Sequence, residues 1–266
     1  MAAGARAAWT GVRLLSLDCT GTLVEWSASL GTLYHRGFAR GAPGVEVPSP
    51  QDIDARFPAA FSAVQREWPL YGRTAGVSSF DWWRAVARRA VEGSALAEEP
   101  EAFERGFAEV YRIFQTAEAY RVCDGVMPFL RWARQLPGLR ICVISNSTGS
   151  YRDAVLPALG LDRYLDFGVY SKLVGLEKPD PAIFRLAAQL AGARPCEVLH
   201  VGKGARKDAA GARAAGCQAL LLDRTGSAGP LPPGVDRVRS FDDVRRWLEA
   251  RSAVAALGHR DLSHFM

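Results

Sequence analysis

The chain has 266 residues, and 48% of them are hydrophobic. This length and hydrophobic content are enough to bury a core and exclude a disordered chain. Its 33 basic and 28 acidic residues give a net charge of +5, but both signs are spread along the chain, so we expect no nucleic-acid partner. No run approaches the roughly 20 apolar residues of a membrane span, so we expect no membrane association. The five cysteines show no CxxC spacing, which favours reduced thiols in a cytoplasmic protein.

The first predicted element is an apolar strand at residues 14–17, which ends at Asp18 and the turn-forming sequence Thr20-Gly21-Thr22. The preceding Ala/Arg-rich opening, residues 1–8, is similar to a targeting sequence in composition but is too short to predict one. From about residue 30 to residue 121 the apolar spacing becomes helical, with Pro and Gly breaks. This stretch predicts a helical insert, clearest where one face carries Phe103, Phe107, Val110, Tyr111 and Phe114.

Beyond Cys123, predicted strands and helices alternate. Strands are expected at 139–144, 167–170, 198–201 and 219–222, with helices between them, a loop at 226–236 and a last helix at 241–251. Such alternation predicts an α/β fold with a Rossmann-like, mostly parallel sheet flanked by helices. Sheets of this kind bind ligands at the carboxyl ends of their strands.

Four polar segments follow predicted strands: residues 18–22, 145–146, 178–180 and 202–208. Taken singly, each is typical of an ordinary cap or turn. Together and in this order they resemble the four motifs of the haloacid dehalogenase-like superfamily, over nearly the whole chain. Within it, Trp68-Pro69-Leu70-Tyr71-Gly72, Trp82-Trp83 and the run 219–224 resemble the haloacid dehalogenase-like hydrolase domain-containing protein 3 group, in particular its plant-like members.

The resemblance implies a role for each motif. Asp18 is implied as the catalytic nucleophile, Thr22 as the residue that fixes its loop, Ser145 with Asn146 as the phosphate-binding pair, and Lys178 as the cation that neutralises nucleophile and substrate. The helical insert, residues 30–121, is implied to be a cap domain on an α/β core domain formed by residues 1–29 and 122–266. A cation is needed because an attacking carboxylate and a phosphate repel each other by several kcal/mol in a partly desolvated site.

Two positions depart from the family pattern. Thr20 stands where the phosphatases carry an acid–base Asp, a loss worth roughly 10²- to 10⁴-fold in rate. Lys203 stands where the family carries a magnesium-binding Asp, so we expect no metal cofactor, although Asp18, Thr20 and Asp208 remain weak candidates as ligands of the family's Mg²⁺. Asp208 is implied to steady Lys178, and we expect the Lys203 ammonium to pair with Asp18 or Asp208 in place of the metal.

Three functions remain open. The first is a hydrolase with an Asp nucleophile and weak or metal-independent activity on a small phosphorylated molecule. The second is a catalytically inactive binding or scaffold protein that has kept the fold, and the third, a minority interpretation, is a metal-free dehalogenase. The expected partner is a small-molecule substrate or ligand, and the sequence makes no prediction of oligomeric state.

Two further features have a structural and a functional interpretation. The aromatic cluster of Tyr71, Phe80, Trp82 and Trp83 either lines a substrate pocket or, as the pattern favours, forms the core of the helical insert. His200 precedes the fourth motif, and its place in a strand predicts a buried core histidine without a catalytic role.

Overall fold

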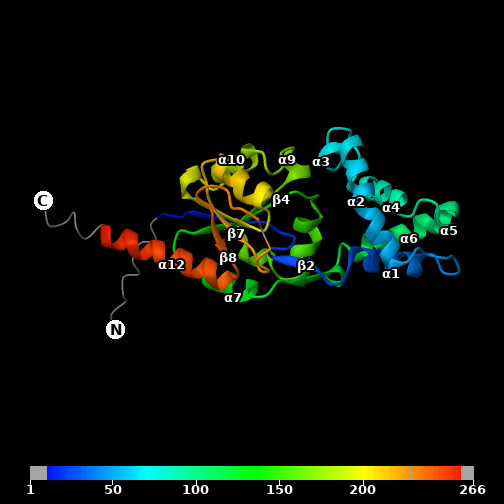
Figure 1. Cartoon of the computed structure of the whole chain (residues 1–266), viewed down its shortest axis with the longest axis horizontal. Helices are drawn as coiled ribbons and strands as arrows, with labels where there is room; N and C mark the ends of the chain where they lie inside the picture. The colour runs from blue at the N-terminus through cyan, green and yellow to red at the C-terminus, as the bar shows by residue number, and fades with distance from the viewer. Residues whose placement is uncertain (1–10, 228, 259–266) are drawn as a thin grey trace, which may run out of the picture.

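The computed structural model describes residues 11–227 and 229–258, so the Ala/Arg-rich opening lies outside the described residues. At its centre is a six-stranded sheet in the order β5-β4-β1-β6-β7-β8, with every neighbouring pair parallel (Figure 1). The strands are β1 (Leu14–Leu17), β4 (Arg140–Ser145), β5 (Phe167–Tyr170), β6 (Val198–Gly202), β7 (Gln218–Leu222) and β8 (Asp236–Val238). The predicted α/β class and parallel sheet are confirmed.

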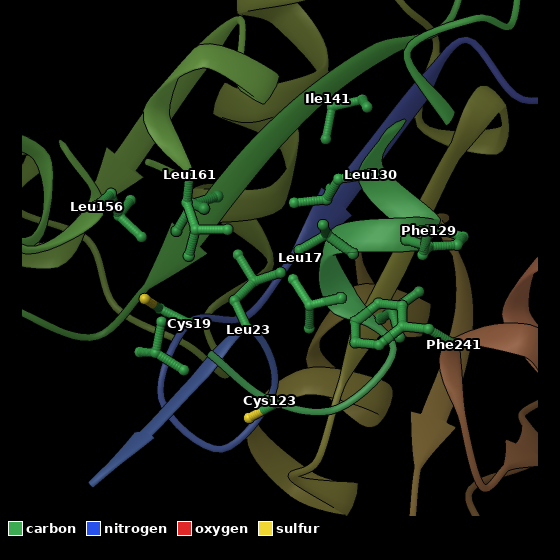
Figure 2. Packing of buried hydrophobic residues seen from close by; sticks show 14 of the residues in the cluster. Leu17, Cys19, Leu23, Cys123, Phe129, Leu130, Ile141, Leu156, Leu161 and Phe241 are labelled. Carbon is green, nitrogen blue, oxygen red and sulfur yellow. The ribbon is translucent and has the colours of Figure 1, made fainter. Parts of the chain in front are cut away.

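Helices cover both faces of the sheet because successive strand residues point to opposite sides. Helices α7 (Val126–Ala133) and α12 (Phe241–Gly258) lie on one face, and α10 (Pro181–Leu190) and α11 (Gly211–Ala214) pack on the other (Figure 1). Leu15 and Leu17 of β1 accordingly belong to the first cluster and Leu14 to the second. Figure 2 shows the first cluster, in which Leu17 and Ile141 from the sheet pack near Leu130 of α7.

The stretch between β2 and β3 is helical: α1 (Leu30–Gly41), α2 (Pro50–Glu67), α3 (Pro69–Gly72), α4 (Ser79–Ala90), α5 (Ala95–Glu98) and α6 (Pro100–Ile113). Ser29, Ser49 and Ser78 cap α1, α2 and α4, each accepting a hydrogen bond from the third backbone amide of the helix. These helices bury a hydrophobic cluster of their own, running from Tyr34 to Val110, in which Trp82 is fully buried. Figure 1 shows them gathered beside the sheet.

A short antiparallel hairpin joins the helical stretch to the sheet. Strand β2 (Val24–Trp26) pairs with β3 (Tyr120–Val122), placing Glu25 opposite Arg121. The chain therefore leaves and re-enters the sheet region at one place. The sequence did not predict this hairpin, because strands of three residues are too short to show periodicity.

Several turns differ from the expected pattern. The helix expected between the strands at 198–201 and 219–222 begins as a π-helical turn at Ala205–Ala210 that leads into α11, and the predicted loop at 226–236 ends in β8. The remaining short elements are a π-helical turn at Tyr151–Val155, α8 (Leu156–Ala158), α9 (Ser171–Val174), and 3-10 turns at Ala117–Ala119, Asp162–Tyr164 and Pro195–Glu197. Within the described part of the chain, no helix combines the length and apolarity needed to cross a membrane.

Candidate active site

Asp18 lies at the middle of the carboxyl edge of the sheet, because β1 runs between β4 and β6. Its backbone amide donates to the Val201 carbonyl at 2.9 Å, which ties the first residue after β1 to the end of β6. The loop then folds back, with the amides of residues 22–24 donating to the Cys19 carbonyl at 2.8–3.2 Å. Gly21 adopts a φ of +79°, which a side chain would strain. The Asp18 carboxylate is thus held on a tight turn facing the site.

A buried lysine links two carboxylates at this edge. The Lys178 ammonium donates to Oδ1 of Asp18 at 2.7 Å and to Oδ1 of Asp208 at 2.6 Å. Thr22 Oγ1 donates to the other oxygen of Asp18 at 3.2 Å. Burial alone would lower the pKa of Lys178, but the charges of Asp18 and Asp208 outweigh it and raise that pKa above its ordinary value. Lys178 therefore stays charged although its side chain is only 2% exposed.

Asp208 is held in its charged form by three donors. Besides Lys178, His200 Nε2 lies 3.3 Å from its Oδ1, and the Gly204 amide donates to its Oδ2 at 2.8 Å. Burial would raise the pKa of Asp208, but Lys178 and His200 lower it well below its usual range. Burial lowers the pKa of His200 despite the nearby carboxylate, so the neutral ring donates from Nε2 while Nδ1 accepts from Ser16 Oγ at 2.9 Å. His200 is the buried strand histidine that was predicted, but its contact with Asp208 was not.

The second motif lies on the strand next to β1. Ser145 ends β4 and is buried. The Asn146 side chain donates from Nδ2 to the Lys178 carbonyl at 2.8 Å, and its Oδ1 accepts from the Lys178 amide at 2.7 Å. Both amide atoms of Asn146 thus hold the backbone of Lys178, a positioning contact that the sequence did not suggest.

The prediction that the Lys203 ammonium pairs with Asp18 or Asp208 is wrong. Lys203 is exposed, and among the described residues it forms no ion pair with Asp18 or Asp208. Its ammonium instead lies against the Asp18 loop: a Cβ added to Gly21 would come within 2.3 Å of Lys203 Nζ. The physical reason is that Lys178 already occupies the space between the two carboxylates and neutralises one of their two charges.

The donor set at this edge does not fit a magnesium ion. The facing oxygens of Asp18 and Asp208 are bridged by an ammonium, and the second oxygen of Asp208 accepts from the Gly204 amide. Asp18 Oδ2 alone remains, shared with Thr22, and no group of three or more His, Cys, Asp or Glu side chains within the described ranges is arranged to hold a metal. A hard dication needs several oxygen ligands, which these residues do not supply.

Thr20 faces a tyrosine rather than an ionisable acid. Its Oγ1 lies 2.6 Å from the hydroxyl oxygen of Tyr151, a contact with no signal in the sequence. Burial raises the pKa of Tyr151 well above its ordinary value. The phenol is therefore a poor proton donor, and neither hydroxyl replaces a carboxylic acid.

Two contacts from distant parts of the chain brace the site. Arg224 donates to the carbonyls of Gly21 and Thr22 at 2.8 and 3.0 Å, and the Tyr71 hydroxyl, from the helical stretch, donates to the Asn146 carbonyl at 2.6 Å. The sequence offered Tyr71 as a pocket or core residue, but it predicted neither of these contacts, because each acts on backbone carbonyls far away in the chain.

A cavity of about 450 Å³ lies between the helical stretch and the strand-end loops. Thr20 and Asn146 line it from the loops, while Tyr71 and Trp83 line it from the helices. Trp82 belongs instead to the buried cluster of the helices. Within the aromatic cluster, Tyr71 and Trp83 therefore line the pocket and Trp82 belongs to the core, so each of the two interpretations holds for part of the cluster.

Fold and site together define an α/β protein with an aspartate-centred site at the carboxyl edge of a parallel sheet. Residues 12–216 match the haloacid dehalogenase-like hydrolase family, and the chain belongs to this family. Haloacid dehalogenase-like hydrolase domain-containing protein 3 of Homo sapiens is 32% identical over 79% of this chain and 82% of its own length. The predicted resemblance to that group is thereby confirmed.

The chain is also similar to a curated phosphatase and, in fold, to a dehalogenase structure. A phosphoserine phosphatase of Thermus thermophilus is 30% identical over 80% of this chain and 89% of its own length. A 2-haloacid dehalogenase structure from Pseudomonas syringae pv. Tomato DC3000 has a TM-score of 0.63 at 21% identity, covering 90% of this chain and 99% of that one. The second likeness shows the fold alone.

Proposed function

We propose that this chain is a slow, metal-independent hydrolase of a small phosphorylated molecule, with Asp18 as the nucleophile. The observation that carries the proposal is the state of Asp18: its side chain is 13% exposed, one oxygen accepts from the buried Lys178 ammonium and the other from Thr22. A charged, oriented and reachable carboxylate is what nucleophilic catalysis requires.

The proposed reaction has two steps. An oxygen of Asp18 attacks the phosphorus, the bond from phosphorus to the leaving oxygen breaks, and that oxygen departs with the electron pair. Water then attacks the phosphorus of the aspartyl phosphate and the bond from phosphorus to the Asp18 oxygen breaks, which restores the carboxylate and releases inorganic phosphate that keeps the protons of the water. Lys178 screens the repulsion between carboxylate and phosphate, and the buried Ser145 hydroxyl donates to a phosphoryl oxygen. The second step is slow because Thr20 cannot accept a proton from the water.

We assign residues 30–121 as a cap over a core domain formed by residues 1–29 and 122–266. The separate hydrophobic cluster of the helices, the hairpin of β2 with β3 and the cavity beside the strand-end loops support this assignment. The volume of the cavity, about 450 Å³, supports a small-molecule partner. Five free cysteines, four of them buried, support a reducing compartment such as the cytoplasm.

The test is phosphoryl labelling with ³²P-acetyl phosphate in EDTA. Acetyl phosphate is small and has a good leaving group, so it probes the nucleophile without depending on the cavity. We expect slow incorporation of acid-stable, base-labile label into the wild type and none into Asp18→Asn, with matching circular dichroism spectra as the folding control. Absence of label from a folded wild type would contradict the proposal and favour a binding or scaffold protein.

A dehalogenase is supported less well by the site. A haloacid carries a carboxylate and releases a halide, and both need cationic or strong hydrogen-bond donors. Among the described residues that line the cavity there is no arginine, lysine or histidine.

A further inference from the structure

We infer that the substrate is an aryl phosphate, a phosphate monoester of a flat aromatic alcohol, rather than the phosphate of a small charged metabolite such as an amino acid. This inference rests on the proposed function and narrows its substrate. Two independent observations lead to it: the lining of the cavity, and the chemistry available to the leaving group.

The cavity is aromatic and uncharged. Of its 21 lining residues, all in the described part of the chain, 11 are aromatic and none is charged. The aromatic residues are Trp26, Tyr34, Phe57, Phe61, Tyr71, Trp83, Phe107, Tyr111, Phe114, Tyr120 and Tyr151. A zwitterionic amino acid would lose its hydration here without gaining a charged partner, whereas an aromatic ring would exchange water for edge and face contacts. The volume, about 450 Å³, is in the range of small-molecule sites.

One polar atom in the wall has no partner. The Ser147 side chain is buried, with the residue 6% exposed, and its Oγ has no hydrogen-bond partner among the described residues. Ser147 lines the cavity directly after Asn146, whose side chain holds the backbone of Lys178. Because a buried hydroxyl without a partner is costly, it is suited to a polar atom of the ligand, such as the ester oxygen or a ring substituent.

The leaving group must depart without receiving a proton. Thr20 and its partner Tyr151 supply no acid, because the first has no acidic proton in the useful range and burial raises the pKa of the second. An alkyl phosphate would release an alkoxide, whose conjugate acid is about as weak an acid as water. An aryl phosphate releases a phenolate, whose conjugate acid has a pKa of about 10. The bond from phosphorus to the aryl oxygen breaks, the phenolate keeps the electron pair, and it takes a proton from solvent after leaving.

The experiment compares 1-naphthyl phosphate with O-phospho-L-serine in EDTA, measuring phosphate release. We expect kcat/KM for naphthyl phosphate to exceed that for phosphoserine by at least about 10²-fold, the lower bound for lost acid catalysis. Ser62 is exposed on α2 and also lines the cavity, so Ser62→Trp should raise KM for naphthyl phosphate at least about tenfold, a modest loss for a blocked apolar site. Ala59→Trp, also exposed on α2 but outside the lining, is the matched control and should behave as wild type.

Equal or faster turnover of phosphoserine would overturn the inference, and so would a Ser62→Trp variant indistinguishable from Ala59→Trp. If acetyl phosphate labels Asp18 but naphthyl phosphate is not hydrolysed, the inference fails while the proposed function stands. If acetyl phosphate leaves no label, the proposed function fails. The cavity assignment is then decided by calorimetric titration of 1-naphthol: binding that Ser62→Trp abolishes supports an aromatic ligand, and no binding to the wild type overturns it.

Discussion

Replacing Lys178 by methionine should cost the protein a large part of its stability. The ammonium contacts Asp18 at 2.7 Å and Asp208 at 2.6 Å, and at an effective dielectric constant of about 20 each contact is worth roughly 6 kcal/mol of Coulomb attraction. Removing the charges from water offsets much of this, at several kcal/mol per ion. Because Lys178→Met leaves Asp208 buried without its cation, we expect the free energy of unfolding to fall by about 3–5 kcal/mol, the range for breaking a buried pair.

The pH dependence of this loss tests its cause. In the wild type the depressed pKa of Asp208 gives stability that is present above the unfolded value, about 3.9, and is lost only as the pH falls through the lower folded value. Without Lys178, burial raises the pKa of Asp208, so the carboxyl group takes up a proton earlier and the penalty shrinks from pH 8 to pH 5. Urea unfolding at both pH values measures the difference, with the exposed Lys207→Met as control. A loss below about 1 kcal/mol, or one of equal size at both pH values, would refute the reasoning.

Three other predictions address neighbouring groups. Burial lowers the pKa of His200, so its neutral form gives stability above about pH 6.5 that is lost as the pH falls. The free energy of unfolding, measured by urea titration, should therefore decline less from pH 7 to pH 5 in His200→Gln than in the wild type. Gly202→Ala would place a Cβ 2.4 Å from Asp208 Cγ and should cost about 1–3 kcal/mol in thermal unfolding, whereas Gly229→Ala, with open space around it, should not. Lys203→Asp should make phosphoryl labelling dependent on magnesium, because it restores the carboxylate that binds the metal in the family. Unchanged labelling in titrations of Mg²⁺ would contradict the expectation that Lys203 keeps magnesium out.

The parts of the fold that could be predicted are those with strong local patterns. The strands at 14–17 and 167–170 have the bounds that were predicted, because a short apolar run between turn residues is typical of a buried parallel strand. Strand β8 and the hairpin of β2 with β3 could not be predicted, because three-residue strands that carry charged residues gain their stability from pairing rather than from pattern.

The candidate site could be predicted as a set of loops but not as a set of contacts. Parallel topology brings the ends of β1, β4 and β6 to one edge, whatever the side chains do. The direction of each side chain depends on space that only the fold defines. Lys203 lies over Gly21 because that glycine leaves room, and Asn146 turns to the Lys178 backbone because two unpaired peptide groups lie there.

The two departures from the family pattern, at Thr20 and Lys203, place related demands on a substrate. Phosphoryl transfer passes through a loose transition state, in which charge builds on the leaving oxygen before the nucleophile has fully bonded. A phenolate spreads that charge into its ring, so it needs no proton from position 20. It also moves charge away from Asp18, which reduces the need for a dication where Lys203 now stands and leaves Lys178 as the cation beside the nucleophile. A substrate with an aryl leaving group therefore meets both constraints at once, whereas an alkyl phosphate meets neither.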